Sequence, residues 1–174
     1  MSGRLLLGVT GSSAASSVPS LLNAAAGRGW NVKVVATPHA EPFLSHVQQH
    51  VHTNAEWRES AAPLHLELLQ DIDAFLIAPA TANTIGACAQ GLAGNLLTAL
   101  VLAHKPPVHF WPTMNRQMWR NPAVQHNVRK LSMFRHHVLP PDPSPSLTTD
   151  HPTAAVGPIS GTVLDHLAHC SYCP

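Results

Sequence analysis

The segment Ala74-Phe75-Leu76-Ile77-Ala78-Pro79-Ala80-Thr81-Ala82-Asn83-Thr84 decides the fold of this chain. Its apolar first half, residues 74–78, has the length and composition of a buried parallel strand. The small and hydroxyl residues of 79–84 form a loop that opens onto a helix predicted over 85–90. Free backbone N–H groups and the positive end of the helix dipole at such a junction suit an anionic ligand. A plain capped loop without a ligand is an equally good interpretation of these residues alone.

The pattern of a buried strand followed by a helix recurs along the chain. Strands are predicted over 4–9, 31–36 and 108–111, and helices over 18–25, 43–47, 63–69, 96–103, 124–131 and 159–168. This alternation is typical of an α/β fold with a doubly wound parallel sheet, here a single domain over 1–174. Residues 48–62 are predicted to be irregular. Trp57, within this segment, either covers a ligand or packs at an oligomer interface, and the sequence favours neither interpretation.

The loop after the first strand has the composition of a phosphate site. Gly11 allows a tight turn, the hydroxyls of Ser12 and Ser13 can donate to phosphate oxygens, and a helix follows. The G-x-G-x-x-G fingerprint and the P-loop lysine are both absent, which disfavours a dinucleotide or a nucleoside triphosphate. Thr37 ends the second strand at the same edge of the sheet. The pattern therefore favours the phosphate of a mononucleotide.

Composition excludes some classes of protein. The net charge of +1 gives no basic field for nucleic acid or a membrane surface. With 45% hydrophobic and 11% charged residues, we expect surface that is buried in an oligomer. No run approaches the ~20 apolar residues of a membrane helix, and no signal peptide opens the chain. We expect a cytoplasmic protein.

The three cysteines are not predicted to be catalytic or to bind metal. Cys88 lies in an apolar helical segment and is predicted to be an inert buried thiol. Cys170 and Cys173, with His166 and His169 upstream, could bind Zn²⁺. We favour a flexible tail over 169–174 and expect no metal. Residues 139–158 are rich in proline, and a loop of this length is usually a functional lid or disordered.

Four segments together carry a resemblance to a known family. They are 8–15 (Gly-Val-Thr-Gly-Ser-Ser-Ala-Ala), 79–84, Pro112-Thr113-Met114-Asn115 and His65, with 116–119, 125–127 and 156–158 in support. In order and spacing they resemble the homo-oligomeric flavin-containing cysteine decarboxylases, over about residues 4–131. This family includes phosphopantothenoylcysteine decarboxylase and the peptide cysteine decarboxylases of lantibiotic and thioamitide biosynthesis.

The resemblance implies a flavodoxin-like fold, homotrimers that can pair into dodecamers, and FMN as the cofactor. It implies two catalytic residues, His65 as the active-site histidine and Asn115 as the residue that holds the substrate carboxylate. The cofactor-binding residues that it implies are Gly11, Ser12, Ser13, Thr37, Phe43, Pro79, Ala80, Thr81, Ala82, Asn83 and Thr98. The substrate-binding residues that it implies are Asn83, Asn95, Thr113, Met114 and Asn115.

These residue types suit the chemistry of the family. A cysteine carboxylate cannot lose CO₂ unless its thiol is first oxidised to a thioaldehyde, which accepts the electrons left behind. That redox step belongs to FMN. An imidazole titrates near neutral pH and suits the base that deprotonates the thiol or Cβ. A neutral amide at Asn115 can hold a carboxylate without the strong ion pair that would oppose its departure.

The sequence departs from phosphopantothenoylcysteine decarboxylases at their A-C-G-D-x-G-P segment. Alignment on Gly157-Pro158 puts Thr153 at the cysteine that protonates the enethiol and Ala155 at the aspartate. Without that thiol the reaction should stop at the aminoenethiol, as in the peptide decarboxylases, where residues 139–156 correspond to a substrate clamp. Thr113, where Ala or Ser is more usual, is a second departure, with little effect expected.

We therefore favour oxidative decarboxylation of the C-terminal cysteine of a ribosomally made precursor peptide, for a macrocycle of the AviCys type. Phosphopantothenoylcysteine decarboxylation in coenzyme A synthesis is the first alternative. A non-catalytic FMN-binding regulator is the second, although it would not need to keep both His65 and Asn115. A flavin prenyltransferase is a weaker further alternative.

Overall fold

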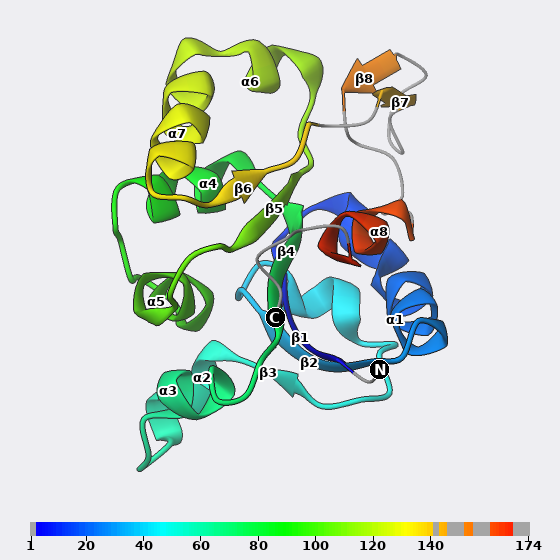
Figure 1. Ribbon diagram of the computed structural model, residues 1–174, viewed down its shortest axis with the longest axis vertical. Helices are drawn as coiled ribbons and strands as arrows, with labels where there is room; N and C mark the ends of the chain where they lie inside the picture. Colours follow the sequence, from blue (N-terminus) through cyan, green and yellow to red (C-terminus); the bar gives the residue numbers. More distant parts are fainter. Residues whose placement is uncertain (1–2, 141–142, 146–151, 155–160, 169–174) are drawn as a thin grey trace.

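The computed structural model describes residues 3–140, 143–145, 152–154 and 161–168 (Figure 1). Its centre is a six-stranded parallel sheet. The strands lie in the order β3 (Val51–His52), β2 (Trp30–Ala36), β1 (Gly3–Val9), β4 (Ala74–Ala80), β5 (His109–Pro112) and β6 (His137–Val138). When the short edge strand β3 is set aside, the order is that of flavodoxin-like sheets, which confirms the predicted fold class.

Helices cover both faces of the sheet (Figure 1). The first face carries α1 (Val18–Gly27), α8 (Thr162–Ala168) and a 3₁₀ turn, η1 (Ser13–Ser17). The second face carries α3 (Leu64–Leu68), α4 (Ala82–Ala89), α5 (Leu96–Ala103) and α7 (Pro122–Met133). Strand β4 is buried along its whole length, with Leu76 packed on the first face and Phe75 and Ile77 on the second. The continuous apolar run of this segment reflects burial on both faces.

Two parts of the predicted secondary structure were wrong. Residues 48–62 are not irregular, because they contain β3 and the helix α2 (Asn54–Glu59). Thr53 caps α2 by accepting a hydrogen bond from the N–H of Glu56, a spacing that the sequence displays. The four predicted strands are present, but the edge strands β3 and β6 were missed, since two-residue strands have no periodicity to read.

Smaller differences concern helix ends. The helix predicted over 85–90 begins at Ala82, because Thr81 is its N-cap. The helix predicted over 43–47 is a 3₁₀ turn, η2 (Glu41–Leu44). A short helix, α6 (Arg116–Arg120), follows β5.

The proline-rich segment is not irregular throughout. Its described parts form an antiparallel pair, β7 (Pro143–Pro145) with β8 (Pro152–Ala154). Strand β8 contacts α6, which places this pair beside the end of β5 (Figure 1). Gly157-Pro158, Ala155 and the predicted tail over 169–174 lie outside the described residues. None of the described helices has the length and apolar character needed to cross a membrane.

Strand β5 carries a buried histidine that makes stability depend on pH. His109 is 3% exposed, and its ring stacks on that of His137 with centroids 5.0 Å apart. Burial, and then the charges of His137 and His166, lower the pKa of His109 to about 4. In the unfolded chain the imidazole takes up a proton near pH 6.5, whereas in the folded chain it stays neutral until about pH 4. The contribution of neutral His109 to the free energy of unfolding is therefore fully present above about pH 6.5 and is lost as the pH falls toward 4.

We expect the free energy of unfolding to fall by about 2 kcal/mol between pH 7 and pH 5 through His109 alone. Urea unfolding at the two pH values measures this loss. The variant His109→Gln removes the titrating group and should show a smaller loss, the remainder arising from His104 and His136, whose pKa values burial also lowers. An equal loss in this variant would show that His109 does not titrate on unfolding.

Candidate active site

The candidate site lies at the carboxyl ends of the central strands, where β1 and β4 are neighbours. The chain winds from β1 toward β2 on one side and from β4 toward β5 on the other, so a topological switch point lies between β1 and β4. Ligands of open α/β sheets bind at such points. Thr10, 1% exposed, spans this switch point. Its hydroxyl donates to the Pro79 carbonyl at 2.7 Å and accepts from the Thr81 N–H at 3.0 Å.

Two further hydrogen bonds extend this edge outward. The Thr37 N–H donates to the Val9 carbonyl at 3.0 Å and joins the loop after β2 to β1. The Thr113 N–H donates to the Ala80 carbonyl at 2.9 Å and joins the loop after β5 to β4. The predicted loops at 10–13, 37, 79–84 and 112–115 therefore form one continuous edge.

The loop after β1 fits a phosphate group. A Cβ on Gly11 would lie 2.5 Å from the His39 Cβ and 2.9 Å from the His39 carbonyl oxygen, so only glycine allows the two loops to approach this closely. The Ser12 hydroxyl accepts from the Ala14 N–H at 3.3 Å and starts η1. The hydroxyls of Ser13 and Thr37 make no hydrogen bond within the described part of the chain. Hydroxyl and amide donors suit a phosphate.

The loop after β4 combines buried and accessible residues. Pro79 and Ala80 are buried, whereas Ala82 is half-buried and Asn83 is exposed. Thr81 caps α4 by accepting from the Thr84 N–H at 3.4 Å. The capped-loop interpretation is thus correct for Thr81. Ala82 and Asn83 remain accessible to a ligand. Their predicted role in binding one is still a prediction.

Asn115 presents an amide group at the end of β5. It is exposed and is the N-cap of α6, where its Oδ1 accepts from the Met118 N–H at 2.8 Å. This bond leaves the Nδ2 hydrogens directed away from the helix as donors. Thr113 and Met114, just before it, are each 5% exposed, so Asn115 alone of the three reaches solvent.

Other predicted residues have structural roles of their own. Asn95 and Thr98 form the capping box of α5, with bonds of 3.0 Å and 3.2 Å between each backbone N–H and the other side chain. Thr98 is only 2% exposed. Phe43, in η2, is 40% exposed and is available to cover a bound ring. The ligand roles of these residues remain predictions.

His65 lies in α3, on the second face of the sheet. Its Nδ1 atom is buried and has no hydrogen-bond partner within the described residues. Buried polar nitrogens are nearly always hydrogen-bonded, so this atom is expected to bind a partner that the described residues do not supply. The Trp57 ring meets the His65 ring edge to face, with centroids 6.1 Å apart. Trp57 is therefore half-buried on a helix and not in an exposed loop.

Cys88 is excluded as a nucleophile. Its side chain is 7% exposed on α4, and burial raises the pKa of its thiol to about 12. The thiol therefore stays protonated at neutral pH and is unreactive, as the sequence predicted. Cys170 and Cys173 lie outside the described residues.

Comparison with known proteins identifies the family. The sequence pattern of the family named Flavoprotein matches residues 2–169. The chain belongs to the flavoprotein family. It is 36% identical to the phosphopantothenoylcysteine decarboxylase of Mus musculus, over 79% of this chain and 72% of that protein. It is 38% identical to the coenzyme A biosynthesis bifunctional protein CoaBC of Vibrio vulnificus, over 74% of this chain, but it spans only 34% of that protein's length.

Solved structures agree with the flavoprotein fold. A mutant of PPC decarboxylase complexed with pantothenoylaminoethenethiol superposes with a TM-score of 0.85 at 28% identity, covering 97% of both chains. The FMN-dependent cysteine decarboxylase SpaF superposes with a TM-score of 0.73 at 29% identity, covering 95% of both chains. These neighbours confirm the flavodoxin-like fold but include both branches of the predicted family.

The contribution of the Thr10 hydrogen bonds to stability can be tested by substitution. Thr10→Val keeps the shape of the side chain but leaves the Pro79 carbonyl and the Thr81 N–H without their partner. We expect the free energy of unfolding to fall by about 2–4 kcal/mol, since one buried and one half-buried backbone group lose a hydrogen bond. Urea unfolding measures the loss. Thr113→Val is the matched control, because Thr113 is also a buried threonine at this edge, but it is joined to the loop after β4 by its backbone N–H and not by its hydroxyl. An equal loss in both variants would show that the bridge contributes nothing.

Proposed function

We propose that this flavoprotein is an FMN-dependent decarboxylase of the C-terminal cysteine of a ribosomally made precursor peptide. The product would be an aminoenethiol for formation of an AviCys-type macrocycle. The observation that carries the proposal is the buried Nδ1 of His65, which has no hydrogen-bond partner among the residues that the structure describes. The family and the cysteine decarboxylases among its structural neighbours support the reaction class.

The loops after β1 and β2 would hold the cofactor. Ser12, Ser13 and Thr37 supply hydroxyls for the FMN phosphate, and Gly11 keeps the two loops close enough for one phosphate to reach both. The loop over 79–84 and Phe43 would lie against the ring system. When bound, FMN accepts the two electrons that leave the cysteine as its thiol becomes a thioaldehyde.

His65 would take the proton that the substrate gives up in this oxidation. Its imidazole is half-buried against Trp57, so its orientation is restricted by packing before the substrate arrives. A base held in this way suits general base catalysis, in which geometry matters as much as pKa.

Asn115 would hold the substrate carboxylate. Its Nδ2 hydrogens can donate to one carboxylate oxygen while its Oδ1 stays bound to α6. Because the amide carries no charge, the carboxylate can leave as CO₂ without breaking an ion pair.

The paired strands β7 and β8 would close over the peptide. Strand β8 contacts α6, the helix that Asn115 caps, so the pair lies beside the proposed carboxylate position. Thr153 lies in β8 with its backbone opposite Ser144. With threonine at this position, no thiol protonates the enethiol, which favours the aminoenethiol as the final product.

Other copies of the chain would complete the site. Exposed apolar side chains stand next to both proposed catalytic residues, Leu66 beside His65 and Met118 beside Asn115, at 49% and 44% exposure. Apolar groups around a reactive site are usually covered. This arrangement supports a homotrimer, with pairing into a dodecamer as a further step.

Phosphopantothenoylcysteine decarboxylation is the second candidate function. The similarity to the Mus musculus enzyme over 72% of that enzyme's length favours it. Thr153 disfavours this second function, because phosphopantothenoylcysteine decarboxylation would need a cysteine at that position to protonate the enethiol.

Mass spectrometry distinguishes the two functions. The flavin-loaded protein is incubated with a short apolar peptide ending in cysteine and, separately, with phosphopantothenoylcysteine. Loss of about 46 mass units from the peptide, which is CO₂ plus two hydrogens, is the expected result. Loss of about 44 units from the pantothenoyl compound alone would assign the protein to coenzyme A synthesis. No change in either, with FMN still bound, would favour a regulator.

A further inference from the structure

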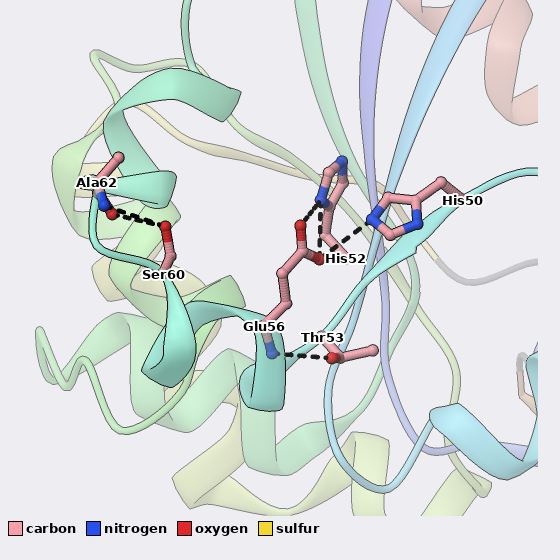
Figure 2. A network of polar contacts seen from close by, with 6 residues as sticks. All are labelled: His50, His52, Thr53, Glu56, Ser60 and Ala62. Carbon is pink, nitrogen blue, oxygen red and sulfur yellow. Dashed lines mark hydrogen bonds and ion pairs between the residues drawn. The ribbon is translucent and has the colours of Figure 1, made fainter.

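A second group of reactive side chains lies away from the candidate active site, where β3 meets α2. His50 and His52 both point at the carboxylate of Glu56 (Figure 2). The His50 Nε2 lies 3.2 Å from Oε2, and the His52 Nδ1 lies 3.0 Å and 3.1 Å from the two carboxylate oxygens. One ligand atom from each residue falls within 4.8 Å of the other two.

The local fold explains why these three side chains meet. His50 immediately precedes β3 and His52 ends it, and their rings meet edge to face with centroids 4.4 Å apart. Glu56 is the third residue of α2, a position from which a glutamate usually bonds back to the N-cap residue. Thr53 does accept from the Glu56 N–H, but the hydrogen bonds found for the Glu56 carboxylate go to the histidines.

The three ligand atoms have the chemistry that binds a cation. A glutamate that is not deeply buried carries an ionised carboxylate at neutral pH, and the Glu56 side chain is 34% exposed. Two imidazole nitrogens and one carboxylate are a common ligand set for Zn²⁺. At Zn–ligand distances of about 2.0–2.2 Å, tetrahedral ligands lie about 3.3 Å apart. The distances from Glu56 to each histidine are close to this value, and the two histidine nitrogens lie within 4.8 Å of each other.

We propose that His50, His52 and Glu56 bind one Zn²⁺ ion or a similar divalent transition-metal ion. The His50 side chain is 67% exposed, so the fourth coordination position faces solvent and is open to water. The prediction that no metal binds rests on the terminal cysteines alone. The spacing H-x-H-x₃-E is the sequence signal for this second site.

The proposed ion would stabilise a helix that contacts two parts of the fold. Asn54, in the first turn of α2, is buried, and its Oδ1 accepts from the Leu96 N–H at 2.8 Å where α5 begins. Trp57, one turn further on, packs against His65. An ion that joins the edge strand to Glu56 therefore holds the helix that supports the His65 ring, although the metal proposal does not depend on the proposed decarboxylation.

Equilibrium dialysis of the flavin-loaded protein against Zn²⁺ tests the site. We expect one tightly bound Zn²⁺ per chain, with affinity lowered at least about tenfold in Glu56→Gln and in His52→Gln. His126→Gln, at an exposed histidine of α7, is the matched control and should bind Zn²⁺ as the parent does. His50→Gln guards against misfolding, because this exposed side chain can be replaced without loss of packing.

The terminal cysteines require a separate control. A Cys170→Ser, Cys173→Ser double variant should keep the tight Zn²⁺. Zn²⁺ should also raise the thermal midpoint of the parent and of this double variant, but not that of Glu56→Gln. The proposal is overturned if the tight ion disappears with the cysteines, or if the His50, His52 and Glu56 variants bind Zn²⁺ as tightly as the parent.

Discussion

We expect His65→Asn to keep FMN bound and to lower the rate of the proposed decarboxylation by about a thousandfold. Asparagine fills part of the same space against Trp57 and can still form hydrogen bonds, but it cannot take up a proton at neutral pH. The flavin is retained because the residues proposed to hold it lie on the loops after β1, β2 and β4, whereas His65 lies on α3. Flavin absorbance measures occupancy, and release of CO₂ from a peptide ending in cysteine measures turnover.

The control for this substitution is His126→Asn, which makes the same change at an exposed histidine of α7. We expect this variant to keep full activity. If His65→Asn also keeps its activity, His65 has no part in the reaction and the buried Nδ1 needs another explanation. If it loses its flavin, His65 supports the cofactor, and the proposed role as a base would have to be abandoned.

We expect Asn115→Asp to lower kcat/KM for the proposed peptide substrate about a hundredfold, mainly through KM. Aspartate caps a helix as well as asparagine does, so α6 should be unchanged. The substitution replaces the Nδ2 donor with a carboxylate oxygen, which repels the carboxylate of the substrate. Kinetics with the same peptide at two ionic strengths check this, since added salt should relieve part of the repulsion.

Asn121→Asp is the matched control for Asn115. Asn121 is an exposed N-cap whose Oδ1 accepts from the Ala123 N–H at 2.9 Å, so the same charge is added one helix further along the chain. We expect little effect there. Asn115→Ser removes the donor without adding charge and should lie between the parent and Asn115→Asp. Full activity in Asn115→Asp would rule out contact with the substrate carboxylate.

The central strands and the loops that follow them were predictable because they lie in the interior of the sheet and at its carboxyl edge. Strand β4 is buried on both faces, so its sequence is a continuous apolar run, and the loops that follow the strands consist of small and hydroxyl residues. The edge strand β3 and the helix next to it have no comparable hydrophobic pattern. Strand β3 has two residues, and α2 has six, of which only Asn54 is buried, so neither shows a period.

The contacts that organise the site depend on partners far apart in the chain. The Thr10 hydroxyl meets the loop after β4 across 71 residues, and no local pattern shows which of several hydroxyls does so. The pairing of Trp57 with His65 depends on how two short helices pack. The resemblance to the family points to His65, but the sequence does not reveal that the Nδ1 atom of His65 is buried and has no partner among the described residues.

The cap at the start of α6 has a consequence for the choice of substrate. A free asparagine side chain can rotate to present either its oxygen or its nitrogen, but the bond from the Met118 N–H fixes Oδ1 inward on Asn115. A substrate carboxylate held at the proposed position would therefore meet the N–H groups of this side chain and not its oxygen. A peptide whose last residue ends in a free acid can accept from them, whereas a C-terminal carboxamide would also present N–H groups of its own. By this asymmetry the enzyme would distinguish a true chain terminus from an amidated one before any chemistry begins.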